Sequence, residues 1–335
     1  MKTTSWLRRG AAALAFVAAA AAQAAGTVGT TFPADFPVIE DATLQKAVIG
    51  FGAAGAVTRT PVIFLHGNND VPYAAGTCSP TNGKIQLLAQ HLADNGWSTS
   101  ELWGLGYQGD QCDLVATPAD PNANGKRARI GHTNQANVPD LRRFVAAVLA
   151  YTGAKQVDIV GHSLGGTLAR EWMRQDDVQH LVRRLVTIDS PHHGIINCSG
   201  DAGNLYQLVA LGGFTPSSDV CQELGSPDTP FLKRLNGRGG HEETEGPTKV
   251  LTIRNADTSF VYFPLPDGLL PVAPAIDIYG KATDFSQSAR LKGARNIDLT
   301  GQGAYDAGVL KSAHLGILQS PQTKAAVVEF LSGRR

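Results

Sequence analysis

The sequence has no surplus of charge of one sign. Its 335 residues include 29 Lys and Arg against 29 Asp and Glu, and charged residues make up only 17% of the chain. A nucleic-acid-binding surface requires clustered positive charge, so we expect no nucleic-acid partner. The hydrophobic share of 43% is typical of a globular chain with a large core and excludes a disordered one.

Long apolar runs are also scarce. The longest, residues 11–22, follows three cationic side chains and precedes the small residues of a signal-peptidase site. We therefore expect residues 1–24 to be a signal peptide, used by either the Sec or the twin-arginine route, and residues 25–335 to form one exported domain. No later run of about 18 apolar residues exists, so no transmembrane segment is expected.

Cysteine is limited to four residues, and none of them stands in a C-x-x-C spacing or a Cys/His cluster. We therefore expect no zinc site, and we assign no metal-ligating residues; the sequence does not decide whether a structural calcium is bound. An even number of cysteines in an exported chain indicates disulfide bonds. The simplest pairing joins Cys78 to Cys112 and Cys198 to Cys221, with the two other pairings and free thiols as alternatives.

Short apolar runs alternate with amphipathic stretches from Pro61 onward, which predicts a mostly parallel sheet with helices on both faces. The expected strands are 61–65, 101–107, 157–160, 185–188, 249–254 and 294–299. The expected helices cover about 85–94, 139–152, 164–175 and 323–331. The pattern breaks over about 195–247, a Gly-, Ser-, Pro- and Asp-rich insertion that we interpret as a lid or cap.

The sequence Gly161-His162-Ser163-Leu164-Gly165 has the G-x-S-x-G spacing of a nucleophile elbow, with a strand before it and a helix after it. Such a turn lifts a serine hydroxyl above the sheet, and Gly161 and Gly165 leave room for it. The alternative is a nucleotide-binding turn with an incidental serine. Neither the G-x-G-x-x-G nor the G-x-x-x-x-G-K-[ST] spacing fits this segment, which favours the elbow.

A His-Gly pair, His66-Gly67, follows the first strand where this architecture places the oxyanion loop. We expect the main-chain amides of Asn68 and Leu164 to stabilise an oxyanion. His66 itself precedes the serine in the chain, which is the wrong order for a base.

A serine nucleophile needs a histidine base and a carboxylate that orients it, in the chain order Ser, Asp or Glu, His. His314 lies on the loop before the closing helix, and we predict it as the base. The rival histidines lie inside the elbow, directly after the next strand, or in the insertion: His162, His192, His193 and His241.

We predict Asp257 as the acid, because it ends a strand and a strand end positions a carboxylate better than a loop does. Asp189 also ends a strand and is the main rival. Three further carboxylates lie in loops: Asp267, Asp277 and Asp306.

With these motifs in place, the chain resembles the secreted bacterial lipases of the α/β-hydrolase superfamily, in particular the class 2, Bacillus-type lipases. It is also similar to extracellular polyhydroxybutyrate depolymerases with a lipase box. The matching segments are 151–166, 64–67, 293–297 and 313–316, together with the Ser-Pro-His sequence at 190–192. The resemblance implies an α/β-hydrolase fold, the family's acid at Asp257 and the oxyanion amides at Asn68 and Leu164. The small class 2 lipases lack the 195–247 insertion, so the resemblance implies nothing about the substrate pocket.

The expected activity is therefore that of a secreted serine ester hydrolase that acts without a metal or an organic cofactor on esters such as acylglycerols. Alternatives are a polyhydroxyalkanoate depolymerase, an acyltransferase and a non-catalytic binding module.

Overall fold

In a computed structural model, the structure describes residues 26–43, 45–68, 70–74, 83–107, 133–199, 214, 216, 218–237, 243–244, 246–257, 274–307 and 311–333. The expected signal peptide and the expected Cys78–Cys112 pair lie outside these residues. Within them, no helix combines the length and the apolarity that a membrane span requires.

The core of the fold is a seven-stranded sheet, in which every neighbouring pair is parallel except the edge pair β1–β3. Its strands, in spatial order, are β1 (Ile49–Phe51), β3 (Leu102–Gly106), β2 (Val62–Leu65), β4 (Val157–His162), β5 (Val182–Ile188), β6 (Lys249–Asn255) and β9 (Arg295–Leu299). Six of these strands are the predicted ones. The antiparallel edge strand β1 was not foreseen. A separate two-stranded hairpin contains β7 (Ala275–Ile276) and β8 (Ala282–Thr283).

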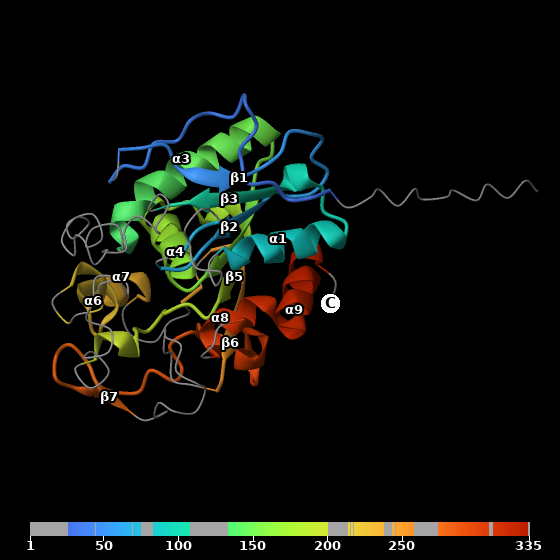
Figure 1. The fold of residues 1–335 in the computed structure, drawn as a ribbon. Helices are drawn as coiled ribbons and strands as arrows, with labels where there is room; N and C mark the ends of the chain where they lie inside the picture. Colours follow the sequence, from blue (N-terminus) through green and yellow to red (C-terminus); the bar gives the residue numbers. More distant parts are fainter. Residues whose placement is uncertain are drawn as a thin grey trace, which may run out of the picture.

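Helices cover both faces of this sheet, which confirms the predicted α/β-hydrolase architecture (Figure 1). The helices are α1 (Lys84–Asp94), α3 (Asn134–Thr152), α4 (Leu164–Asp176), α6 (Asp219–Leu224), α7 (Pro230–Leu235), α8 (Ala313–Gly316) and α9 (Pro321–Ser332). On β2, Ile63 and Leu65 belong to the core beneath α3 and α4, whereas Val62 and Phe64 belong to the core beneath α1 and α9. This alternation of buried apolar residues explains why the strand reads as a continuous apolar run.

Helix α3 begins earlier than the sequence predicted. Pro139 was expected near the start, but it lies inside the helix, which begins at Asn134 after the N-cap Thr133. Glu223 of α6 accepts hydrogen bonds from the main-chain amides of Asn134 and Gln135. A carboxylate 89 residues away in the sequence thus satisfies the first amides of the helix. Local sequence signals could not reveal that contact.

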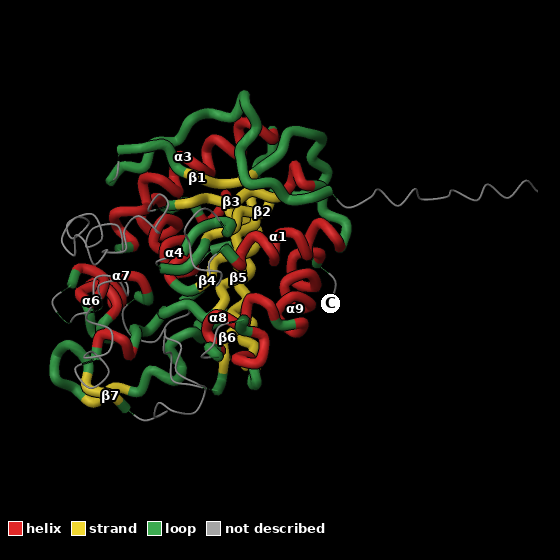
Figure 2. The backbone as a smooth tube through the Cα atoms, in the orientation of Figure 1, coloured by secondary structure: helices red, strands yellow, loops and turns green. Residues whose placement is uncertain are grey.

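The described part of the insertion is fastened to the domain. The disulfide Cys198–Cys221, with its Cα atoms 5.5 Å apart, joins α6 to the 3₁₀ turn η4 (Ile196–Cys198) and confirms the second predicted pair. The main-chain amide of Ile195 donates to the carbonyl oxygen of Leu224 at 2.8 Å. Figure 2 shows α6 and α7 side by side at one end of the sheet, next to α4.

A pair of buried carboxylates joins the N-terminal segment to α3. Asp41 and Asp140 are 1% and 0% exposed, and burial, followed by the charge of Asp41, raises the pKa of Asp140 to about 7. Because the folded state holds this proton more tightly than the unfolded chain does, protonation stabilises the fold fully below about pH 4. That contribution is lost as the pH rises through about 7.

The substitution Asp140→Asn is therefore expected to raise the melting temperature at pH 8 by about 2 °C or more, because asparagine mimics the protonated acid. At pH 5 the variant and the wild type should melt within about 1 °C of each other. Thermal unfolding followed by circular dichroism at both pH values checks this. A variant that is less stable than the wild type at pH 8 would show that a negative charge on Asp140 beside Asp41 does not destabilise the fold.

Candidate active site

The turn between β4 and α4 holds Ser163 in a backbone conformation that few side chains adopt, with φ 51° and ψ −124°. The amide of Ser163 donates to the carbonyl oxygen of Ile188 at 2.9 Å, which ties the turn to β5. A Cβ atom at Gly161 would lie 2.6 Å from the main chain of Gly165, and one at Gly165 would lie 2.6 Å from the carbonyl oxygen of Leu65. Both glycines are therefore required for the close approach of β4, α4 and β2.

His314 is the second residue of α8 and is almost fully buried. Its ring lies 4.7 Å, centroid to centroid, from the ring of His162, the residue before Ser163. The Nε2–H of His162 donates to the carbonyl oxygen of His314 at 2.9 Å. Burial, followed by the charge of His314, lowers the pKa of His162 well below its usual value, so His162 is neutral. His162, inside the elbow, thus holds the main chain of α8 at residue 314.

The acid that faces His314 is Asp189. The Nδ1–H of His314 donates to Asp189 Oδ2 at 2.7 Å, and both side chains are 1% exposed. Asp189 follows β5 with φ 47°, and its amide donates to the carbonyl oxygen of Ile253 at 2.7 Å. Asn255 donates to the same carboxylate through its main-chain amide and its side-chain amide. A carboxylate held from two sides fixes both the tautomer and the orientation of the imidazole.

Asp257, the acid predicted from the sequence, does not face His314, so that prediction is corrected. Its two carboxylate oxygens accept hydrogen bonds from the amides of Gly301 and Gln302 at 2.9 and 3.1 Å. It therefore caps the 3₁₀ turn η6 (Gln302–Tyr305), whose free amides favour a negative charge. Both carboxylates were candidates in the sequence, but the sequence could not show which of them faces His314.

The turn after β2 lies against the elbow, as the oxyanion expectation requires. A Cβ atom at Gly67 would lie 3.1 Å from Ser163 Cβ. Asn68 is 4% exposed, and Leu164 is the first residue of α4. His66 stacks on Tyr107 at 4.2 Å, and burial lowers the pKa of His66 to about 4. His66 is thus a neutral packing residue of this loop, and the roles of the Asn68 and Leu164 amides remain predictions.

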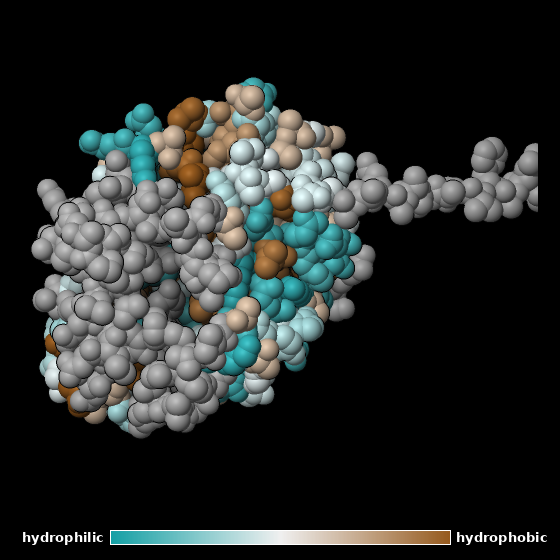
Figure 3. All heavy atoms as spheres, in the orientation of Figure 1, coloured by the Kyte–Doolittle hydropathy of each residue, from teal (hydrophilic) through white to brown (hydrophobic). Residues whose placement is uncertain are grey.

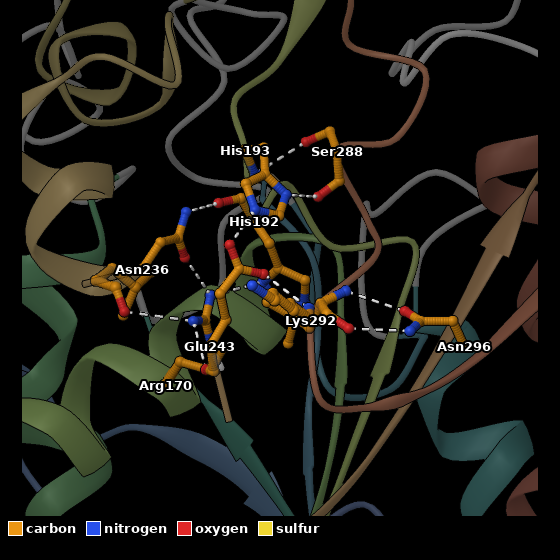
Figure 4. A network of polar contacts seen from close by, with 10 residues as sticks. Arg170, His192, His193, Asn236, Glu243, Ser288, Lys292 and Asn296 are labelled. Atoms are coloured by element: carbon orange, nitrogen blue, oxygen red, sulfur yellow. Dashed lines mark hydrogen bonds and ion pairs between the residues drawn. The ribbon is translucent and has the colours of Figure 1, made fainter. Parts of the chain in front are cut away.

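The Ser-Pro-His-His-Gly segment takes part in a different polar network (Figure 4). His192 is buried, with Nε2 3.0 Å from the hydroxyl of Thr187 and Nδ1 3.3 Å from the guanidinium of Arg170. His193 lies 2.7 Å from Glu243 and 3.1 Å from the carbonyl oxygen of Ser288. These contacts connect the insertion to β5 and to the segment before β9, so neither ring serves the elbow.

A buried ion pair near the site was missed by the sequence analysis. Lys84 Nζ lies 2.8 Å from Asp306 Oδ1, with the two side chains 7% and 1% exposed. A neighbouring carboxylate, Asp70, accepts the amides of Val71 and Gly83, and burial raises its pKa to about 6. Asp306 had been considered only as a poorly positioned loop acid. Nothing in the local sequence around residue 84 distinguishes this lysine from a surface one.

Comparison with known proteins places the chain among lipases. The family model described as lipase (class 2) matches residues 59–258, which include Ser163 and Asp189. The mature Bacillus licheniformis lipase BlEst2 is 19% identical, with a TM-score of 0.50 over 84% of this chain and 97% of that one. Aspergillus fumigatus lipase B is 17% identical, with a TM-score of 0.48 over 84% of this chain. This chain spans only 55% of that fungal protein. With a family match over more than half of its length, the chain belongs to the class 2 lipases, a family of carboxylic ester hydrolases with the α/β-hydrolase fold.

Proposed function

We propose that the protein is an exported serine ester hydrolase in which Ser163 is the nucleophile, His314 the general base and Asp189 the residue that orients the base. The observation that carries this proposal is the hydrogen bond between His314 and Asp189 beside a strained serine turn. A strand-to-helix serine combined with a carboxylate-paired imidazole is the arrangement that activates a hydroxyl.

In the first half of the reaction, Ser163 Oγ attacks the ester carbonyl carbon while His314 Nε2 takes the hydroxyl proton. Asp189 stabilises the imidazolium without itself becoming protonated. The negative charge on the former carbonyl oxygen is accepted by the amides of Asn68 and Leu164, each of which contributes about 3 kcal/mol to lowering the barrier. The position of Leu164 at the start of α4 adds the positive end of the helix dipole.

Collapse of the tetrahedral intermediate releases the alcohol, which leaves with the proton that His314 returns. Water then attacks the acyl-enzyme by the same route: His314 removes a proton from it, and the carboxylic acid departs as Ser163 recovers its hydrogen. Every proton in this cycle passes through one imidazole, so the fixed tautomer of His314 is needed in both halves.

For the substrate, we propose carboxylic esters met outside the cytoplasm, such as acylglycerols. The Cys198–Cys221 disulfide supports an oxidising compartment. We further propose that residues 195–247 act as a cap over the site. On the face shown in Figure 3, hydrophobic residues of the described chain form small separate areas.

A substrate panel tests this proposal: p-nitrophenyl esters of short and long acyl chains, a triglyceride emulsion and a polyhydroxybutyrate film. We expect the esters to be hydrolysed and the film to be left intact, with free acid and alcohol as the products. If hydroxybutyrate is released from the film faster than the p-nitrophenyl esters are hydrolysed, the protein is instead a polyester depolymerase. Transfer to an added alcohol without free acid would assign an acyltransferase.

A further inference from the structure

The buried ion pair between Lys84 and Asp306 joins two parts of the chain that are 222 residues apart. Lys84 is the first residue of α1, and its neighbours Ile85, Leu88 and Leu92 already anchor this helix in the core. Burying both charges is costly, because each ion loses its hydration, and apolar residues often stabilise such a site as well or better. The packing of α1 therefore does not explain why a lysine is buried here.

On one side, the pair controls the start of the helix that carries His314. Asp306 Oδ1 accepts from Lys84 Nζ at 2.8 Å, and Asp306 Oδ2 accepts from the main-chain amide of Ser312 at 3.1 Å. Ser312 is the N-cap of α8, and its carbonyl oxygen accepts from the amide of Gly316. One carboxylate thus connects α1 to the first turn of α8, two residues before His314.

On the other side, the same end of α1 holds the loop after β2. Gly83, which precedes Lys84, donates its amide to Asp70 Oδ1 at 2.8 Å. A Cβ atom at Gly83 would lie 2.0 Å from the main chain of Ala74, so the loop packs directly on this glycine. Asp70 is only two residues beyond Asn68. Gly83 and Lys84 therefore contact both the oxyanion loop and the histidine loop.

We propose that the Lys84–Asp306 pair is a positioning device that fixes α8, and with it His314, relative to the loop that carries Asn68. This inference rests on the proposed function, because it assigns the pair a role in the ester hydrolysis described above. Neither side chain touches the reacting atoms. They act by holding two loops that are distant in the sequence in a fixed position relative to each other. A misplacement of a catalytic group by about 1 Å lowers the rate by up to about 100-fold.

The test compares the isosteric neutral variants Lys84→Met and Asp306→Asn, alone and combined, in p-nitrophenyl ester hydrolysis. We expect Lys84→Met to lower kcat by about 10- to 100-fold with KM changed by less than about threefold. Asp306→Asn keeps an oxygen for the Ser312 amide and should lose less. The double variant leaves no buried unpaired charge, so its kcat should exceed that of Lys84→Met, which is the non-additivity expected of a coupled pair.

Arg183→Met is the matched control, because it also leaves a fully buried carboxylate, Asp158, without its arginine. Asp158 is the second residue of β4, whereas Ser163 follows the last residue of that strand, so the two lie at opposite ends of it. The control should lose thermal stability while its kcat stays within about threefold of the wild type. If Lys84→Met loses stability like the control but keeps its kcat, the pair is merely structural and the inference is overturned.

The outcomes separate this inference from the proposed function. A wild-type protein that hydrolyses none of the esters contradicts the function itself. An active wild type with active Lys84 and Asp306 variants contradicts only the positioning role. If Lys84→Met does not fold, Asp306→Asn and the double variant decide: equal kcat values near that of the wild type in both would contradict the inference.

Discussion

Ser163→Ala is expected to lower kcat for p-nitrophenyl ester hydrolysis by about 10⁶-fold, which leaves a rate only about 10³- to 10⁴-fold above that without enzyme. Without Oγ no acyl-enzyme forms, and the remaining groups offer only binding and an oxyanion site. The fold should persist, because the turn depends on the main-chain bond from residue 163 to Ile188 and on the flanking glycines, not on the hydroxyl. Initial rates together with the melting temperature measure both effects.

Ser288→Ala serves as the control for this substitution. Ser288 is also buried, but its hydroxyl donates to the carbonyl oxygen of Gly194 and not to a residue of the elbow. This variant should keep the wild-type kcat to within about threefold. Hydrolysis retained by Ser163→Ala would remove the basis for a serine mechanism at this turn.

Asp189→Asn is expected to lower kcat by about 10³- to 10⁴-fold with little change in KM. An asparagine at this position presents either an amide nitrogen that repels the Nδ1–H of His314 or an oxygen without charge. In the first case the imidazole is forced into the wrong tautomer, and in the second the imidazolium loses the negative charge that stabilises it. Steady-state kinetics over a range of pH values measures the loss.

Asp257→Asn is the matched comparison, since it makes the same chemical change at the rival strand end. Asp257 accepts two main-chain amides at the start of η6, those of its N-cap Gly301 and of Gln302, and an asparagine oxygen can still accept one of them. We expect a modest loss of stability and a kcat within about tenfold of the wild type. The reverse ranking, with Asp257→Asn the more damaging substitution, would return the role of the acid to Asp257.

The elbow and the fold could be predicted because their causes are local. The glycines at 161 and 165 are required by contacts within one strand–turn–helix unit and the strand beside it, and the apolar runs record burial on both faces. The disulfide between Cys198 and Cys221 was also found by the simplest pairing of sequence neighbours. Patterns such as these can be recognised because the residues that form them lie close together in the sequence.

The carboxylate that pairs with His314 could not be predicted, because Asp189 and Asp257 follow adjacent parallel strands and emerge at the same edge of the sheet. The choice depends on the positive φ of Asp189 and on Asn255, which holds its carboxylate toward His314. The start of α3 and the Lys84–Asp306 pair are equally nonlocal, since each depends on a side chain dozens or hundreds of residues away. A single sequence carries no signal for such contacts.

The central claim is that residue 163 becomes nucleophilic because an imidazole and a carboxylate from distant segments meet it. Its most direct test is to treat the folded protein with a fluorophosphonate and to locate the adduct by peptide mass spectrometry. The account predicts one adduct, on the peptide that contains Ser163, formed rapidly in the wild type and in Asp257→Asn but very slowly in Asp189→Asn. An adduct on another residue, or equal labelling rates in all three proteins, would contradict it.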